Sequence, residues 1–243
     1  MANIFTFSGN GTITDAVNTY GNWNTVETQR LQHALKKTLR GEHKLSESVR
    51  TMEGFSGRLY RSLINNLIET TPDARYLEIG SWTGSTACAA MEGNSCDVLC
   101  IDNWHGLHAG QTAPSEEAKS AKETFQKNTN SIITEKINFK FIEQNYKTID
   151  YNTLGKFNVY LFDGPHEFQD QVDGIIMAQP ALDDTYVLII DDFNYLTAQD
   201  ATAKAFEEIK ANAIAWLDIR TTRDALGVSS NWHNGYYIGV IKK

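Results

Sequence analysis

The sequence predicts an α/β fold in which a mostly parallel sheet is covered by helices on both faces. Five short apolar runs, each long enough for one strand, alternate with segments of helical periodicity. This alternation is typical of βαβ units, whose strands are buried on both sides. Two further apolar runs close the sequence without a helix between them, which predicts an antiparallel terminal pair.

The predicted parallel strands occupy Arg75–Ile79, Asp97–Ile101, Ile137–Ile142, Phe157–Phe162 and Thr185–Ile190. Helices are expected near residues 84–92, 115–130, 166–179 and 197–211. The terminal pair is expected at Ala213–Ile219 and Tyr236–Ile241, after a turn at Asn234-Gly235. Ligands of such sheets bind beyond the carboxyl ends of the strands, so the residues that follow each strand are the first candidates for a site.

The first 70 residues have a different pattern. Residues 1–22 are polar and rich in Asn, Thr and Gly, so we expect them to be irregular. Helical patterns follow over Trp23–Arg40 and from Phe55 to Ile68. We therefore divide the chain into an irregular segment with a helical arm or lid, residues 1–70, and an α/β domain, residues 71–243. Because exposed helical arms often pack on a second subunit, we expect a homo-oligomer.

Composition and charge narrow the classes of function. The net charge is −8 and no basic stripe is present, so nucleic acid is not an expected partner. The start, MANIFTFSGNGTITD, does not have the pattern of a signal peptide, and no apolar run approaches the roughly 20 residues of a membrane span. The three cysteines contain no CxxC motif and are expected to be buried, reduced thiols. We expect a cytoplasmic protein with no membrane partner.

A glycine loop, Glu78–Gly84, joins the first parallel strand to the next helix. Gly80 and Gly84 allow a tight turn and a close approach of the backbone to a ligand. Asp102 ends the second strand, where a carboxylate can accept both hydroxyls of a ribose. These residues suit a dinucleotide as well as S-adenosylmethionine.

Trp82 within this loop favours S-adenosylmethionine. A dinucleotide fingerprint has glycine at this position, so that pyrophosphate can approach the backbone amides at the start of the helix. An indole obstructs that approach, whereas S-adenosylmethionine has no phosphate. Glu78 at the end of the strand also suits a cationic ligand better than a pyrophosphate.

Carboxylates follow the fourth and fifth predicted strands. Asp163 ends the fourth strand, and Asp191 and Asp192 follow the fifth, which should lie beside it, roughly 5 Å away. Three close carboxylates must share protons, meet donors or bind a cation, and hard ions such as Mg²⁺, Mn²⁺ or Ca²⁺ prefer oxygen ligands. His166, at the expected start of the next helix, is a candidate general base.

These motifs resemble the class I S-adenosylmethionine-dependent methyltransferases. LEIGSWTGSTA, CIDNWHG, DGPHEFQDQVDGI and the Asp-Asp pair look closest to the metal-dependent sugar O-methyltransferases of macrolide and aminocoumarin biosynthesis. The resemblance implies a Rossmann-like sheet of five parallel strands plus an antiparallel terminal pair. One departure is Leu182–Thr185, where that family usually has glycines.

The resemblance also assigns roles to residues. Glu78, Gly80 and Ser81 would line the methionine and ribose region, with Asp102 on the ribose. Trp104 would cover the adenine face, Gln144 or Asn145 would meet the adenine edge, and Ser56 would lie near the carboxylate of the donor. The full expected cofactor-binding set is Ser56, Glu78, Gly80, Ser81, Trp82, Asp102, Asn103, Trp104, Gln144, Asn145 and Asp163.

The predicted function is methylation of a small-molecule hydroxyl by S-adenosylmethionine, assisted by a divalent metal, usually Mg²⁺. His166 and Asp163 are the expected catalytic residues, and Asp163, Asp191 and Asp192 the expected metal ligands. His105 and His108 form an H-x-x-H pair that we expect to be solvated rather than ligating. The alternatives are a metal-free methyltransferase, a nucleotide-dependent oxidoreductase, and a non-catalytic binding protein on the same fold.

Overall fold

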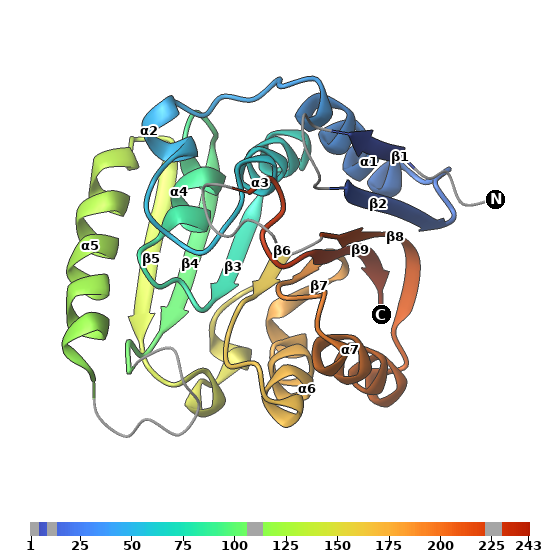
Figure 1. Cartoon of the computed structure of the whole chain (residues 1–243). Coiled ribbons are helices and arrows are strands. Elements are labelled where there is room, and N and C mark those ends of the chain that lie inside the picture. The colour runs from blue at the N-terminus through green and yellow to red at the C-terminus, as the bar shows by residue number, and fades with distance from the viewer. Residues whose placement is uncertain (1–4, 9–13, 106–113, 222–229) are drawn as a thin grey trace.

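The computed structural model describes residues 5–8, 14–105, 114–221 and 230–243. Within them, the strands form one mixed sheet in the order β1-β2-β8-β9-β7-β6-β3-β4-β5 (Figure 1). The strands are β1 Phe5–Ser8, β2 Thr14–Gly21, β3 Arg75–Ile79, β4 Cys96–Asp102, β5 Ile137–Glu143, β6 Phe157–Phe162, β7 Leu182–Ile190, β8 Asn212–Arg220 and β9 Tyr236–Lys242. The five central strands are parallel, and β9 runs antiparallel between β7 and β8, as predicted.

Helices cover both faces of this sheet (Figure 1). They are α1 Val26–Leu39, α2 Glu47–Arg50, α3 Arg58–Thr70, α4 Ser85–Met91, α5 Glu116–Ile132, α6 Phe168–Met177 and α7 Leu196–Ile209. Apolar residues of α1, α3, α4 and α5 pack on one face, and those of α6 and α7 pack on the other. None of the described helices is both long and apolar enough to span a bilayer.

Alternation along the strands produces these two cores. Tyr76 of β3 belongs to the core under α3 and α4, whereas Leu77 belongs to the core under α6 and α7. Val159 and Tyr160 of β6 divide between the cores in the same way. Both faces are apolar, which explains why these strands appear in the sequence as continuous apolar runs rather than alternating ones.

The expectation of irregular structure over residues 1–22 is wrong for β1 and β2. β2 pairs antiparallel with β8, so that Val17 lies opposite Ile219, and β1 pairs with β2. Val17 is fully buried and belongs to the same core as Leu31 of α1 and Leu63 of α3. The N-terminal helices therefore form part of the layer that covers the sheet.

Candidate active site

A cavity of about 550 Å³ lies where the parallel strands end, within the size range of small-molecule sites. Loops after β3, β4, β5, β6 and β7 contribute to its wall, together with residues before α3 and before β9. The predicted residues that line it are Ser56, Gly80, Ser81, Trp82, Asp102, Asn103, Gln144, Asn145, Asp163, His166, Asp191 and Asp192. Glu78 and Trp104 are not in its wall.

Gly80 allows two neighbouring strand ends to meet. Its φ is +87°, and a Cβ at this position would lie 1.8 Å from the carbonyl oxygen of Asp163. The Asp163 amide donates to the carbonyl oxygen of Ile79 at 2.8 Å, and the Gly80 amide donates to that of Ile101 at 2.9 Å. Only glycine fits here, because both the backbone conformation and the space exclude a side chain.

Asp102 organises the glycine loop from within. Its Oδ2 accepts the backbone amides of Ser81 and Trp82 at 2.8 and 2.9 Å, and its Oδ1 accepts the amide of Trp104 at 2.8 Å. Burial raises the pKa of Asp102, while these amide donors act in the opposite direction. Three of about four acceptor positions are occupied, which leaves room for about one ligand hydroxyl.

Trp82 and Trp104 have different surroundings. Trp82 has a φ of +46° and lines the cavity, with its ring 6.4 Å from that of Phe55. Trp104 is buried against Phe125, and its Nε1 donates to the Trp82 carbonyl oxygen at 2.9 Å. The Trp104 ring therefore packs behind the loop, outside the cavity wall.

Glu78 lies beneath the cavity wall. It is completely buried, and its Oε2 accepts the Tyr76 hydroxyl at 2.6 Å. Burial raises the pKa of Glu78 to about 7. Its charge can reach a ligand only through the loop above it.

The adenine-edge candidates line the cavity but also bond locally. The Gln144 side-chain amide donates to Thr148, and Oδ1 of Asn145 accepts the backbone amide of Lys147 at 3.0 Å. Oδ1 of Asn103 similarly accepts the backbone amide of His105 at 3.2 Å. His105 also lines the cavity, whereas His108 lies outside the described residues.

Asp163 and Asp191 form an acidic pair just after the neighbouring strands β6 and β7; Asp191 is buried and Asp163 is half-buried. Burial and then the charge of Asp191 raise the pKa of Asp163. Burial and then the charge of Asp192 raise the pKa of Asp191 to about 8. The two carboxyl groups hydrogen-bond to each other, so in the absence of a cation they share a proton at neutral pH.

His166 and Asp192 form a second pair in the same cavity. His166 Nδ1 lies 3.2 Å from Asp192 Oδ2, and the imidazole is half exposed. Asn234 Nδ2 donates to the other oxygen, Asp192 Oδ1, at 2.7 Å. His166 precedes α6, which begins two residues later than predicted, at Phe168. The arrangement leaves Nε2 of the imidazole available to accept a proton.

Several residues of the wall were missing from the predicted site set, among them Phe55, His233 and Asn234. Two backbone bonds hold the turn before β9 against the segment after β7, from Phe193 to Gly235 and from Asn194 to Asn234. Asn234-Gly235 has the sequence of an ordinary turn. The pairing of Asn234 with Asp192 depends on a contact across the sheet, which no local signal indicates.

A metal site requires ligands that converge. Among the described residues, no group of three or more His, Cys, Asp and Glu side chains is arranged to hold an ion. Asp192 is directed to His166 and Asn234, while Asp163 and Asp191 bond to each other. The carboxylate donors suit a hard cation, but in this arrangement they do not form the predicted ligand set.

The family comparison agrees with this geometry. Residues 77–193, from β3 to just beyond β7, match the model of a family described as a methyltransferase domain. The fold matches that of Rossmann-like methyltransferases. The narrower resemblance to the metal-dependent sugar O-methyltransferases stays a prediction. No curated protein matches the chain in sequence.

Solved structures share the fold at low sequence identity. An O-methyltransferase from Bacillus cereus in complex with SAH is 14% identical with a TM-score of 0.50, over 88% of this chain and 91% of that one. Precorrin-6y C5,15-methyltransferase from Geobacter metallireducens is 12% identical with a TM-score of 0.50, over 75% and 87%. TrmN from Thermus thermophilus is 14% identical with a TM-score of 0.47, over 76% of this chain. The chain spans about half the length of TrmN, with 48% covered.

Proposed function

We propose that this chain transfers the methyl group of S-adenosylmethionine to a hydroxyl group of a small molecule. The observation that carries the proposal is the His166–Asp192 pair, at 3.2 Å, in the same cavity as the loop of Gly80 and Asp102. The loop that we expect to bind the nucleoside and the candidate base, His166, therefore line the same cavity.

The glycine loop, Glu78–Gly84, supports the part of the proposal that concerns the methyl donor. Asp102 has acceptor capacity left for a ribose hydroxyl, and Trp82 occupies the position where a dinucleotide would need glycine. The acidic groups that follow the neighbouring strands, Asp163 and Asp191, suit the positive sulfonium better than a pyrophosphate. These features support S-adenosylmethionine over a nicotinamide dinucleotide.

The transfer is a single displacement. The acceptor oxygen attacks the methyl carbon, a C–O bond forms, and the C–S bond breaks to release S-adenosylhomocysteine. The hydroxyl proton passes to Nε2 of His166, and Asp192 stabilises the resulting imidazolium through Nδ1. The wall holds both reactants in line, which replaces a bimolecular encounter with a positioned one.

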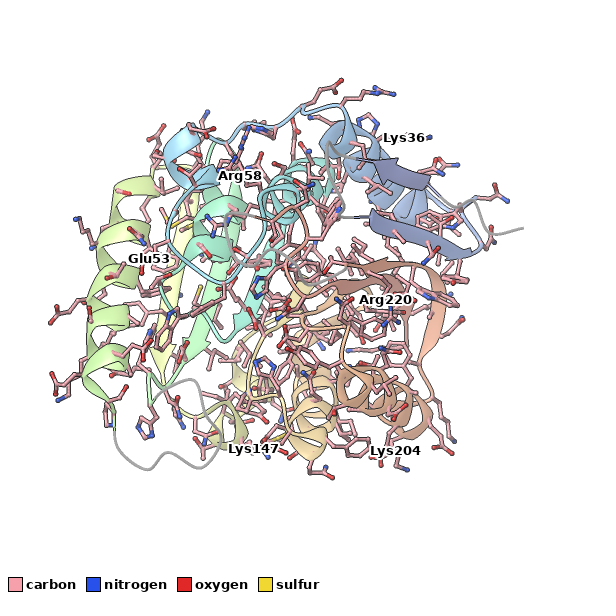
Figure 2. All side chains as sticks on the ribbon, in the orientation of Figure 1. Lys36, Glu53, Arg58, Lys147, Lys204 and Arg220 are labelled. Atoms are coloured by element: carbon pink, nitrogen blue, oxygen red, sulfur yellow. The ribbon has the colours of Figure 1, made fainter. Side chains whose placement is uncertain are left out.

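The charged residues of the cavity wall limit the chemical class of the methyl acceptor. Asp163, Asp170, Asp191 and Asp192 line the cavity, and Lys147 (labelled in Figure 2) is paired with Asp170 and Asp173 at 2.7 Å. A phosphodiester or a carboxylate would be repelled by this wall. We therefore infer a neutral or cationic small-molecule acceptor, and not RNA, although one structurally similar protein, from Pyrococcus horikoshii, is described as a putative RNA methyltransferase.

Metal assistance is a second form of the proposal. Asp191 Oδ1 is buried without a hydrogen-bond partner among the described residues, and a bound Mg²⁺ would relieve the repulsion between Asp163 and Asp191. Asp163, Asp191 and Asp192 would hold such an ion, which would stabilise the developing alkoxide. If turnover is unchanged in excess EDTA, the hypothesis of metal assistance is wrong, and metal-free methyl transfer remains the proposal.

Two measurements test the function. Isothermal titration should show binding of S-adenosylhomocysteine and none of NADH; the reverse result would overturn the proposal in favour of an oxidoreductase. Methyl transfer from labelled donor should then be screened over neutral, cationic and anionic hydroxyl compounds. With an acceptor found, His166→Ala should lower kcat by about 10²–10⁴-fold while leaving S-adenosylhomocysteine affinity unchanged.

A further inference from the structure

Arg61 is a buried cation that the proposed reaction does not use. It lies in α3, is 0% exposed, and appears in none of the ion pairs among the described residues. Its NH1 donates to the carbonyl oxygens of Val49 and Met52 at 3.1 and 2.6 Å. Burial lowers the pKa of Arg61 only to about 10, so the group is positive at neutral pH. A buried charge without a counter-ion is costly to maintain.

Ser56 connects this charge to the cavity. Arg61 Nε donates to Ser56 Oγ at 2.7 Å, and Ser56 lines the cavity wall. Because its oxygen accepts from the guanidinium, the Ser56 hydroxyl must donate its own proton elsewhere. The neighbour at 3.0 Å is the Ser85 hydroxyl, which also lines the cavity and can itself donate. The wall here offers polarised O–H donors and suits an anion.

The loop that carries Ser56 is fixed in place. Thr83 Oγ1 donates to the carbonyl oxygen of Glu53 (labelled in Figure 2) at 2.9 Å. Gly54 has a φ of +153°, and a Cβ there would lie 2.5 Å from Ser85 Oγ. Gly57 is packed closely on the backbone of Asn231. The Ser56 hydroxyl is therefore preorganised and needs no rearrangement to meet a ligand.

Two parts of the cavity wall differ in charge. Arg61 lies behind Ser56 at one wall, whereas Asp163, Asp191 and Asp192 form another. The charges of S-adenosylmethionine are complementary to these two parts of the wall. Its amino-acid portion carries a negative carboxylate, and its transferable methyl group is bonded to a positive sulfonium. Only one orientation places the carboxylate near the cation and the sulfonium toward the aspartates.

We propose that Arg61 orients the methyl donor, its charge acting through the Ser56 hydroxyl on the carboxylate of the methionine moiety. This inference rests on the proposed function, since it requires that S-adenosylmethionine binds. Arg61 is a positioning residue here: it touches Ser56, and Ser56 touches the donor.

The test compares two ligands that differ in the amino-acid portion. S-adenosylhomocysteine carries the carboxylate, and 5′-methylthioadenosine lacks the amino-acid portion. Titration calorimetry should show that the wild type binds S-adenosylhomocysteine more tightly than it binds 5′-methylthioadenosine. Ser56→Ala should weaken S-adenosylhomocysteine binding by about 10-fold or more, the scale of a hydrogen bond to a charged group, and leave 5′-methylthioadenosine unchanged. Arg61→Met should give the same selective loss.

Ser62→Ala is the matched control. Ser62 is as buried as Ser56, but its hydroxyl donates to the Arg58 carbonyl oxygen of its own helix and is not in the cavity wall. It should leave both affinities unchanged. If Ser56→Ala weakens the binding of both ligands equally, or weakens neither, the proposed role of Arg61 is wrong. The proposal that S-adenosylmethionine is the methyl donor is not affected by that result. A wild type that binds neither ligand overturns the proposed function itself. If Arg61→Met does not fold, Ser56→Ala alone decides.

Discussion

The backbone of Asp163 lies against Gly80, so closely that a Cβ on the glycine would come within 1.8 Å of the aspartate's carbonyl oxygen. The loop expected to hold the donor and the first of the acidic residues are therefore joined through the backbone. A change at either position alters the other.

Gly80→Ala should destabilise the protein by about 2 kcal/mol or more, because it adds a backbone clash to the strain of a left-handed alanine. Gly155→Ala is the control: its φ is also +87°, but nothing lies within 4 Å of the added Cβ. Urea unfolding of both variants separates the clash from the strain. Equal losses of stability would show that the contact with Asp163 carries no cost.

Asp191 should make stability depend on pH. Its pKa is about 8 in the folded protein and about 4 in the unfolded chain, so the folded state binds its proton more tightly. Stability is therefore lost as pH rises from about 4 to about 8. Asp191→Asn removes this penalty, so the variant should gain stability relative to the wild type between pH 5 and pH 8.

Urea unfolding in EDTA at the two pH values measures this gain. EDTA is needed because a bound cation would compensate the charges. Asp200→Asn, at an exposed position of α7, is the control. If the difference between wild type and Asp191→Asn is the same at both pH values, the acidic pair does not share a proton.

Asn234→Ala should reduce turnover and spare donor binding. The amide holds Asp192 Oδ1 at 2.7 Å, which directs Oδ2 toward His166. Its loss should lower kcat on the order of tenfold, the scale of one hydrogen bond to a charged group. Asn138→Ala, an exposed residue of β5, serves for comparison. A rise in KM with unchanged kcat would place Asn234 in acceptor binding instead.

The three cysteines should be unreactive in the folded protein. Burial raises the pKa of Cys88 and of Cys96 to about 12, and raises that of Cys100 well above its usual value. Ellman's reagent requires the thiolate, so it should label none of them within minutes under native conditions and all three in guanidinium. Rapid native labelling would show that the sheet around β4 opens.

Sequence periodicity was sufficient for the central sheet, since each buried strand and each crossover helix carries its own local signal. β2 could not be found in this way. Its sequence, TDAVNTYG, is mostly polar, and Val17 gains its burial from α1, α3 and a strand near the other end of the chain. Pairing between distant segments leaves no local pattern.

The site was predictable where chemistry follows a strand end. Asp102, Asp163 and His166 line one cavity because parallel strands finish at one edge. The role of each side chain was harder to predict from the sequence. Glu78 is buried below the wall and Trp104 packs behind it, which depends on rotamers and neighbours that motif spacing does not encode.

The pairing of β2 with β8 joins residues about 200 positions apart, such as Val17 and Ile219. Such a contact closes a long loop and forms slowly, whereas β3 and β4 pair over a short separation. During synthesis, the side of β2 that pairs with β8 must stay unpaired until β8 has left the ribosome. That side of β2 is thus covered late, and a nascent chain stalled before residue 212 exposes it.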